Sequence, residues 1–206
     1  MNTTLLKEYT TTASAGYMGA VKTEGSKSGV FLYGGELSKA IKKALQSVLT
    51  PELKRSDISA RVQTYTGGQN VTITLKLSRQ QYAPTLEEFK DEVKNRVKLG
   101  EYNWIWAEEK GATVQIFHEK YYALSKEEQE KAEELTAEKQ RDYEYNADSV
   151  QINHYYINKE IMLNDRAKEL VKVANTVILA FNRDDSNSMV DYFDTNFYYS
   201  INIKWV

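Results

Sequence analysis

The chain lacks cysteine altogether, and its 206 residues include only two prolines and two histidines. The absence of cysteine excludes disulfide frameworks, thiolate zinc sites and cysteine nucleophiles. No apolar run is long enough to cross a bilayer. No positively charged, apolar leader follows Met1, and we therefore expect a cytoplasmic protein with no membrane partner.

The chain also has no large excess of either charge. It carries 27 basic and 29 acidic residues, which gives a net charge of −2. No whole-protein field therefore draws it onto DNA, RNA or an anionic membrane, so nucleic-acid binding requires a local patch. The length suits one domain of ordinary size or two small ones.

Tyrosine, in contrast, is abundant, with fifteen residues. Tyrosine favours half-exposed strand positions. It is also enriched in binding interfaces, because it combines a large apolar ring with one polar tip. Both explanations are open from the sequence, and they are compatible.

The first half of the chain contains the clearest periodic patterns. Residues 1–35 are rich in Thr, Ser and Gly, and they predict strands near 5–11 and 30–33 with a mobile loop across 25–29. Apolar residues at three- and four-residue spacing predict an amphipathic helix from Leu37 to Leu49. Strict alternation then predicts a hairpin with strands at 58–65 and 71–77, joined by a turn across 66–70.

The second half predicts further helices and strands. Thr85 and Glu88 form a capping box that opens a helix with Leu86 and Phe89 in its apolar stripe. The remaining expected elements are strands at 102–106 and 113–121, a largely polar helix from Ser125 to about Arg141, a strand at 150–157, a helix at 162–181 and a strand at 197–205.

Hairpins dominate the connections in this order of elements. The order predicts an α+β fold, a single domain with a mainly antiparallel sheet packed against several amphipathic helices. We expect residues 1–35 to supply the N-terminal strands and the mobile Gly/Ser/Thr loop. Residues 36–206 then form the α+β domain, with 36–100 and 101–206 as two candidate sub-lobes.

Four aspartates precede the last expected strand: Asp184, Asp185, Asp191 and Asp194. Carboxylates gathered after a helix can hold a hard cation. Their spacing lacks the glycine and the bidentate glutamate of an ion-binding loop, so a solvated loop is the favoured interpretation, and we expect neither a metal nor a cofactor. The acidic run from Glu127 to Asp148 predicts a solvated helix face, with mimicry of a nucleic acid as the alternative.

No catalytic residue is predicted. His118 and His154 lie in expected strands on faces that look buried, and neither has a neighbour that would make it a general acid or base. Lys39, Lys42, Lys43 and Arg61, with Tyr65 nearby, are a candidate site for RNA or single strands, and a solvated helix face is the alternative.

Three segments carry a resemblance to a known family: LSKAIKKAL from Leu37, ISARVQTY from Ile58 and, above all, NRDDSNSMVDYFDTNFYYSINI from Asn182. They resemble the large polyvalent protein-associated domain family numbered twenty-nine, whose members occur in phages, plasmids and other bacterial mobile elements. No catalytic residues come with the resemblance.

The resemblance implies a context and a function. Stand-alone proteins of mobile elements are frequently counter-defence factors, so it implies an anti-CRISPR-like protein in the cytoplasm of a bacterial host. Such a protein inhibits a Cas effector nuclease by binding the nuclease or its guide RNA. The expected partner-binding residues are Asp191, Tyr192, Asp194, Tyr198 and Tyr199. The alternatives are an RNA- or DNA-binding accessory protein of a phage or plasmid, and a metal-dependent nuclease or nucleotide enzyme that uses the aspartates.

Overall fold

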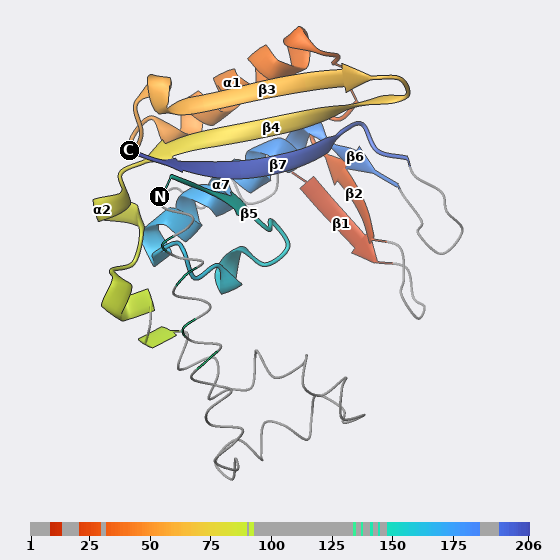
Figure 1. Ribbon diagram of the computed structural model, residues 1–206. Helices are drawn as coiled ribbons and strands as arrows, with labels where there is room; N and C mark the ends of the chain where they lie inside the picture. The colour runs from red at the N-terminus through yellow and green to blue at the C-terminus, as the bar shows by residue number, and fades with distance from the viewer. Residues whose placement is uncertain are drawn as a thin grey trace, which may run out of the picture.

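The computed structural model describes residues 9–13, 21–29, 32–89, 91–92, 148–185 and 194–206, together with residues 134, 137, 141 and 144. It confirms the α+β fold, and the described residues form two sheets and two long helices (Figure 1). The elements are β1 (Tyr9–Ala13), β2 (Val21–Gly25), α1 (Gly35–Leu49), η2 (Arg55–Asp57), β3 (Ile58–Tyr65), β4 (Gly68–Leu77), α2 (Arg79–Tyr82), β5 (Ser149–Ile152), η4 (Ile157–Lys159), α7 (Asp165–Phe181), β6 (Arg183–Asp184) and β7 (Tyr198–Trp205).

The main sheet has four strands in the order β3-β4-β7-β5. Strands β3 and β4 pair antiparallel, as do β5 and β7, whereas β4 and β7 run parallel. The sheet is therefore mixed, with one parallel pair at its centre. Helices α1 and α7 lie behind this sheet in Figure 1, and their buried residues share one core with the strands.

Alternation along each strand explains why the described helices cover one face of the sheet. On β4 the residues Val71, Ile73, Leu75 and Leu77 are completely buried, whereas the residues between them are partly or fully exposed. They meet the buried stripe of α1, in which Leu37, Ile41, Leu45 and Leu49 recur every fourth residue. A stripe with this spacing lies on one side of a helix, so burial of the stripe fixes α1 on the apolar face.

The hairpin turn is shorter than the sequence predicted. The strands are joined at Thr66-Gly67, and Tyr65 pairs directly with Gly68. Gly67 has a φ of 88°, a conformation that favours glycine in a tight hairpin turn. Residues 68–70, expected in the turn, therefore belong to β4.

Capping explains how two helices begin. The capping box is confirmed, because the Thr85 backbone N–H donates to Glu88 Oε2 at 2.8 Å and the Glu88 N–H donates to Thr85 Oγ1 at 3.2 Å. Leu86 of this helix is 37% exposed, so its placement in the apolar stripe was wrong. Helix α7 begins at Asp165, and not at Met162, because Asn164 Oδ1 accepts a hydrogen bond from the Ala167 N–H.

The smaller sheet, in the order β1-β2-β6, joins the N-terminal strands to the C-terminal half. The segment expected as a mobile loop, 25–29, ends β2 and forms a hydrogen-bonded turn, in which Ser28 Oγ donates to the Gly25 carbonyl at 2.7 Å. Leu32 and Tyr33, expected in a strand, are outside any strand. The strands expected at 102–106 and 113–121 lie outside the described residues, as does most of the polar helix.

Candidate functional site

The face of the main sheet turned away from α1 and α7 is uncovered by any described helix, and it faces the viewer in Figure 1. We call it the open face. Alternation places fourteen strand residues on it, all partly or fully exposed: Ser59, Arg61, Gln63, Tyr65, Asn70, Thr72, Thr74, Lys76, Ser149, Gln151, Tyr198, Ser200, Asn202 and Lys204.

The charges of the open face are all positive. Arg61, Lys76 and Lys204 are exposed, and the sequences of β3, β4, β5 and β7 contain no Asp or Glu. Asp57 and Asp148 lie just before β3 and β5, but neither makes an ion pair with these three cations in the described part of the chain. The open face is therefore locally cationic in a chain whose net charge is −2.

Two of the cations are direct neighbours. Lys76 of β4 pairs in register with Lys204 of β7. Adjacent strands lie about 4.8 Å apart, and like charges in such neighbouring positions repel each other. An anion bound between the two ammonium groups would relieve that repulsion.

Two exposed tyrosines lie toward the other end of the open face. Tyr65 is 46% and Tyr198 is 52% exposed. The Tyr65 ring covers Gly68 of the neighbouring strand, because a Cβ added at Gly68 would lie 3.1 Å from the ring carbons. Tyr198 pairs in register with Asn70, which in turn pairs with Gln63. Both rings are accessible to a planar ligand.

Two shallow hollows adjoin β5. The first, of about 370 Å³, is lined by polar groups that include Thr74, Gln151, Asn202 and Lys204. The second, of about 330 Å³, lies where β5 ends and is lined by Gln151, Asn153, His154, Tyr155, Tyr199 and Ser200. Polar surface predominates in the first hollow, whereas apolar surface slightly predominates in the second.

His154 follows β5 in the structure and is half-buried. Its ring centroid lies 4.1 Å from that of Tyr155 and 4.4 Å from that of Tyr199. Burial lowers the pKa of the imidazole, which favours the neutral ring. The expected strand through residue 157 was wrong beyond Ile152, whereas His118 lies outside the described residues.

The expected partner-binding residues that the structure describes are Asp194, Tyr198 and Tyr199, and they have different surroundings. Asp194 accepts two hydrogen bonds from Arg183 Nη2, at 2.8 and 2.9 Å. Tyr198 points to the open face, whereas Tyr199 points to the helix side, where its hydroxyl donates to Asn175 Oδ1 at 2.9 Å. Asp191 and Tyr192 lie outside the described residues.

Asp184 and Asp185 lie where the end of β6 pairs with the residues just before β7. Asp184 forms an isolated bridge with Thr195, and the Asp185 N–H donates to the Asp194 carbonyl at 2.8 Å. Within the described ranges, no group of three or more acidic or histidine side chains could hold a metal ion. The metal-enzyme alternative therefore has no supporting geometry in these residues.

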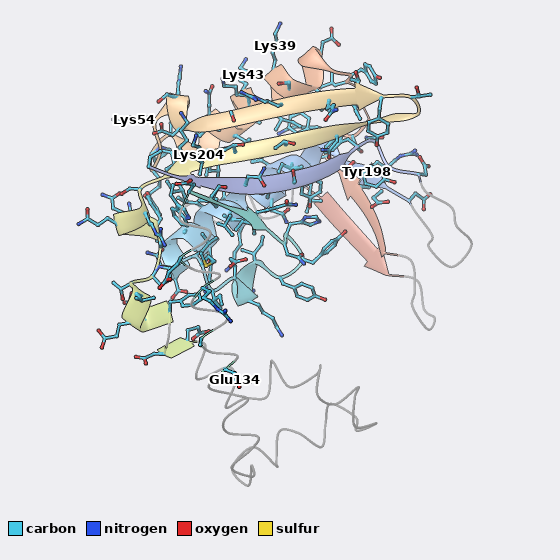
Figure 2. All side chains as sticks on the ribbon, in the orientation of Figure 1. Lys39, Lys43, Lys54, Glu134, Tyr198 and Lys204 are labelled. Carbon is cyan, nitrogen blue, oxygen red and sulfur yellow. The ribbon has the colours of Figure 1, made fainter. Side chains whose placement is uncertain are left out.

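The expected basic patch divides between two surfaces. Lys39, Lys42 and Lys43 are exposed on α1, and Figure 2 shows Lys39 and Lys43 rising beyond the β3 edge of the sheet. Arg61 is on the open face with Lys76 and Lys204, two lysines that we did not single out in the sequence. Each of these lysines occupies an outward-facing position of an alternating strand, directly after a buried apolar residue, which was the available signal.

No described helix is both long and apolar enough to pass through a membrane. No family model matches the chain, and comparison with curated proteins and with solved structures finds no significant match. The resemblance to the mobile-element family therefore stays a prediction.

Proposed function

We propose that the protein binds single-stranded nucleic acid, with RNA as the natural ligand, across the open face. The observation that carries this proposal is the set of exposed cations, Arg61, Lys76 and Lys204, on four strands without an acidic residue. Phosphate groups supply the complementary charge, and release of counterions from the strand adds to the affinity.

The arrangement of aromatic and basic groups favours a single strand over a duplex. From Lys204 to Tyr198 the open face extends about 20 Å along β7, which accommodates a short run of nucleotides. Tyr65 and Tyr198 expose their rings toward one end, and unpaired bases stack on such rings. Bases inside a duplex are already stacked and cannot do so.

Fluorescence anisotropy with a labelled RNA of about twelve nucleotides tests the proposal, with salt varied between about 50 and 200 mM. A triple variant, Arg61→Gln, Lys76→Gln and Lys204→Gln, should bind more weakly than the natural chain. For this variant, the slope of log affinity against log salt concentration should be less steep by about 2, since each phosphate contact on a single strand contributes about 0.7 to the slope. A duplex of the same length should bind more weakly than the single strand.

The control removes the same charge from another surface. Lys39→Gln, Lys42→Gln and Lys43→Gln together change three exposed lysines of α1, off the open face. This variant should keep the affinity and most of the salt dependence. Equal losses in the two triple variants, or no binding by the natural chain, would overturn the proposal.

The resemblance of the C-terminal segment to mobile-element proteins supports a narrower proposal, in which the RNA is the guide of a Cas effector nuclease. A guide RNA must present unpaired bases to its target, which is the type of ligand that the open face would bind. Cleavage by guide-loaded Cas nucleases should then be inhibited, and the open-face triple variant should lose the inhibition. Inhibition that survives in this variant would place the contact on the nuclease protein. Absence of inhibition would leave an RNA- or DNA-binding accessory protein of a phage or plasmid.

A further inference from the structure

The geometry points to a base-reading position on the open face, formed by Gln63, Asn70 and Tyr198, that takes an unpaired adenine. This inference rests on the proposed function, since it concerns the same face and the same ligand. It adds that the protein distinguishes one base from another and does not bind every single strand equally.

Three neighbouring strands bring the residues into one row. Gln63 of β3 pairs in register with Asn70 of β4, and Asn70 pairs with Tyr198 of β7. Adjacent residues of the row are about 4.8 Å apart, so the row is about 10 Å across. A base stacked on the exposed Tyr198 ring would therefore extend its edge over the two amides.

The amides of the row are available to a ligand. Neither the Gln63 nor the Asn70 side chain has a hydrogen-bond partner among the described residues. Gln69, the residue before Asn70, has an amide that is fully used by the fold. Gln69 is 1% exposed, and its amide donates to the Leu32 carbonyl at 2.9 Å and accepts from the Gly34 N–H at 3.0 Å. Where an amide of β4 serves the fold, its donors and acceptor are thus occupied.

The chemistry of the row selects the base. An amide side chain combines an oxygen acceptor with an NH₂ donor, and this pair is complementary to N6–H₂ and N7 of adenine. Guanine is read by Arg or Lys, but the nearest cation on β3 is Arg61, two residues from Gln63. A row with two amides and no charge therefore favours adenine, while Arg61, Lys76 and Lys204 contact phosphates.

The test compares labelled oligonucleotides of about twelve adenosines, uridines or cytidines by anisotropy. The natural chain should bind the adenosine strand at least about fivefold more tightly, which corresponds to the low end of the range for one amide–base pair. Asn70→Thr and Gln63→Thr should remove most of this preference and leave the affinity for the uridine strand within about twofold. Threonine is neutral and favours strands, so both variants should fold, which circular dichroism and thermal unfolding would verify.

Asn202→Thr is the matched control, because Asn202 is an amide of the open face in another row. It should keep the adenosine preference. If the three strands bind equally while the open-face triple variant still loses affinity, base reading is wrong and the proposed function stands. Loss of the preference in Asn202→Thr but not in Asn70→Thr would also overturn the inference. If no strand binds, both proposals fail.

Discussion

The imidazole of His154 is a half-buried titratable group in contact with two tyrosine rings. Burial lowers its pKa below the ordinary value of 6.5, because the charged form loses hydration in the folded chain. The unfolded chain keeps the ordinary value. As the pH falls below about 6.5, the unfolded state therefore binds a proton that the folded state resists, and the free energy of unfolding decreases. The loss ends below the lowered pKa of the folded state.

Replacement of His154 by phenylalanine should remove this part of the pH dependence. Urea unfolding of His154→Phe should show a smaller loss of stability between about pH 7.5 and 5 than the natural chain shows. Titration of the His154 ring by NMR provides the direct check. A midpoint below 6.5 is expected, and a midpoint at or above 6.5 would contradict the burial of the ring.

Tyr198 and Tyr199 are neighbours in the sequence, but their side chains lie on different sides of the main sheet. In the structure, alternation along the last strand places Phe197 and Tyr199 on the core face with Ile201. The same alternation places Tyr198 and Tyr199 on opposite faces of β7. The expected partner-binding set follows a continuous stretch of sequence, whereas a strand divides neighbouring residues between its two faces.

At the scale of elements, Asn164 fixes the start of α7. Its Oδ1 accepts from the Ala167 N–H at 3.0 Å, and its Nδ2 donates to the Gln81 carbonyl at 2.8 Å. The apolar pattern alone extends back to Met162 and Leu163, which are buried although they precede the helix. Burial of a loop thus imitates helical periodicity, and the cap decides the boundary.

Substitution of this cap should destabilise the protein measurably. Asn164→Ala should decrease the free energy of unfolding by about 1 kcal/mol, because the Ala167 N–H loses its acceptor. Asn164→Ser should restore part of the loss, since serine can also cap a helix. Chemical denaturation of the three proteins measures the difference. Equal stability of the alanine and serine variants would contradict a capping role.

At the scale of the whole molecule, Gly25 joins the smaller sheet to the end of α7. Its N–H donates to the Asn182 carbonyl at 2.9 Å, and the Lys27 N–H donates to the Ala180 carbonyl at 2.8 Å. A Cβ at Gly25 would collide with the carbonyl oxygens of Leu179 and Ala180. Backbone atoms cannot turn aside as a flexible side chain can, so the two elements would have to separate.

Gly25→Ala should therefore lower the free energy of unfolding by about 2 kcal/mol or more, measured by denaturation in urea. Gly29→Ala is the matched control, since a Cβ at Gly29 meets no atom within 4 Å. The control should leave stability within about 0.5 kcal/mol of the natural chain. A Gly25→Ala variant as stable as the control would show that the close approach is absent in solution.

Local patterns predicted much of the architecture, including the β3–β4 hairpin, but not the pairing of strands that are distant in the sequence. Alternation identified β3, β4 and β7, and helical spacing identified α1, because each pattern depends on which side is buried. The sequence does not predict the parallel pairing of β4 with β7, because alternation shows which face of a strand is buried and not which strand lies beside it. Lys76 and Lys204 become adjacent only through that pairing. The cationic part of the open face was therefore hidden for the same reason.

The position of β7 between β4 and β5 also has consequences for how the chain reaches its native state. Val71 pairs with Tyr199 and Leu77 with Trp205, so the central pairing joins distant parts of the sequence. Closing so long a loop has an entropic cost before any contact forms, and such topologies fold slowly. Until β7 pairs with it, β4 has an unpaired edge, and its four apolar core residues lack their partners from β7. During synthesis this unpaired edge is open to wrong pairing and aggregation.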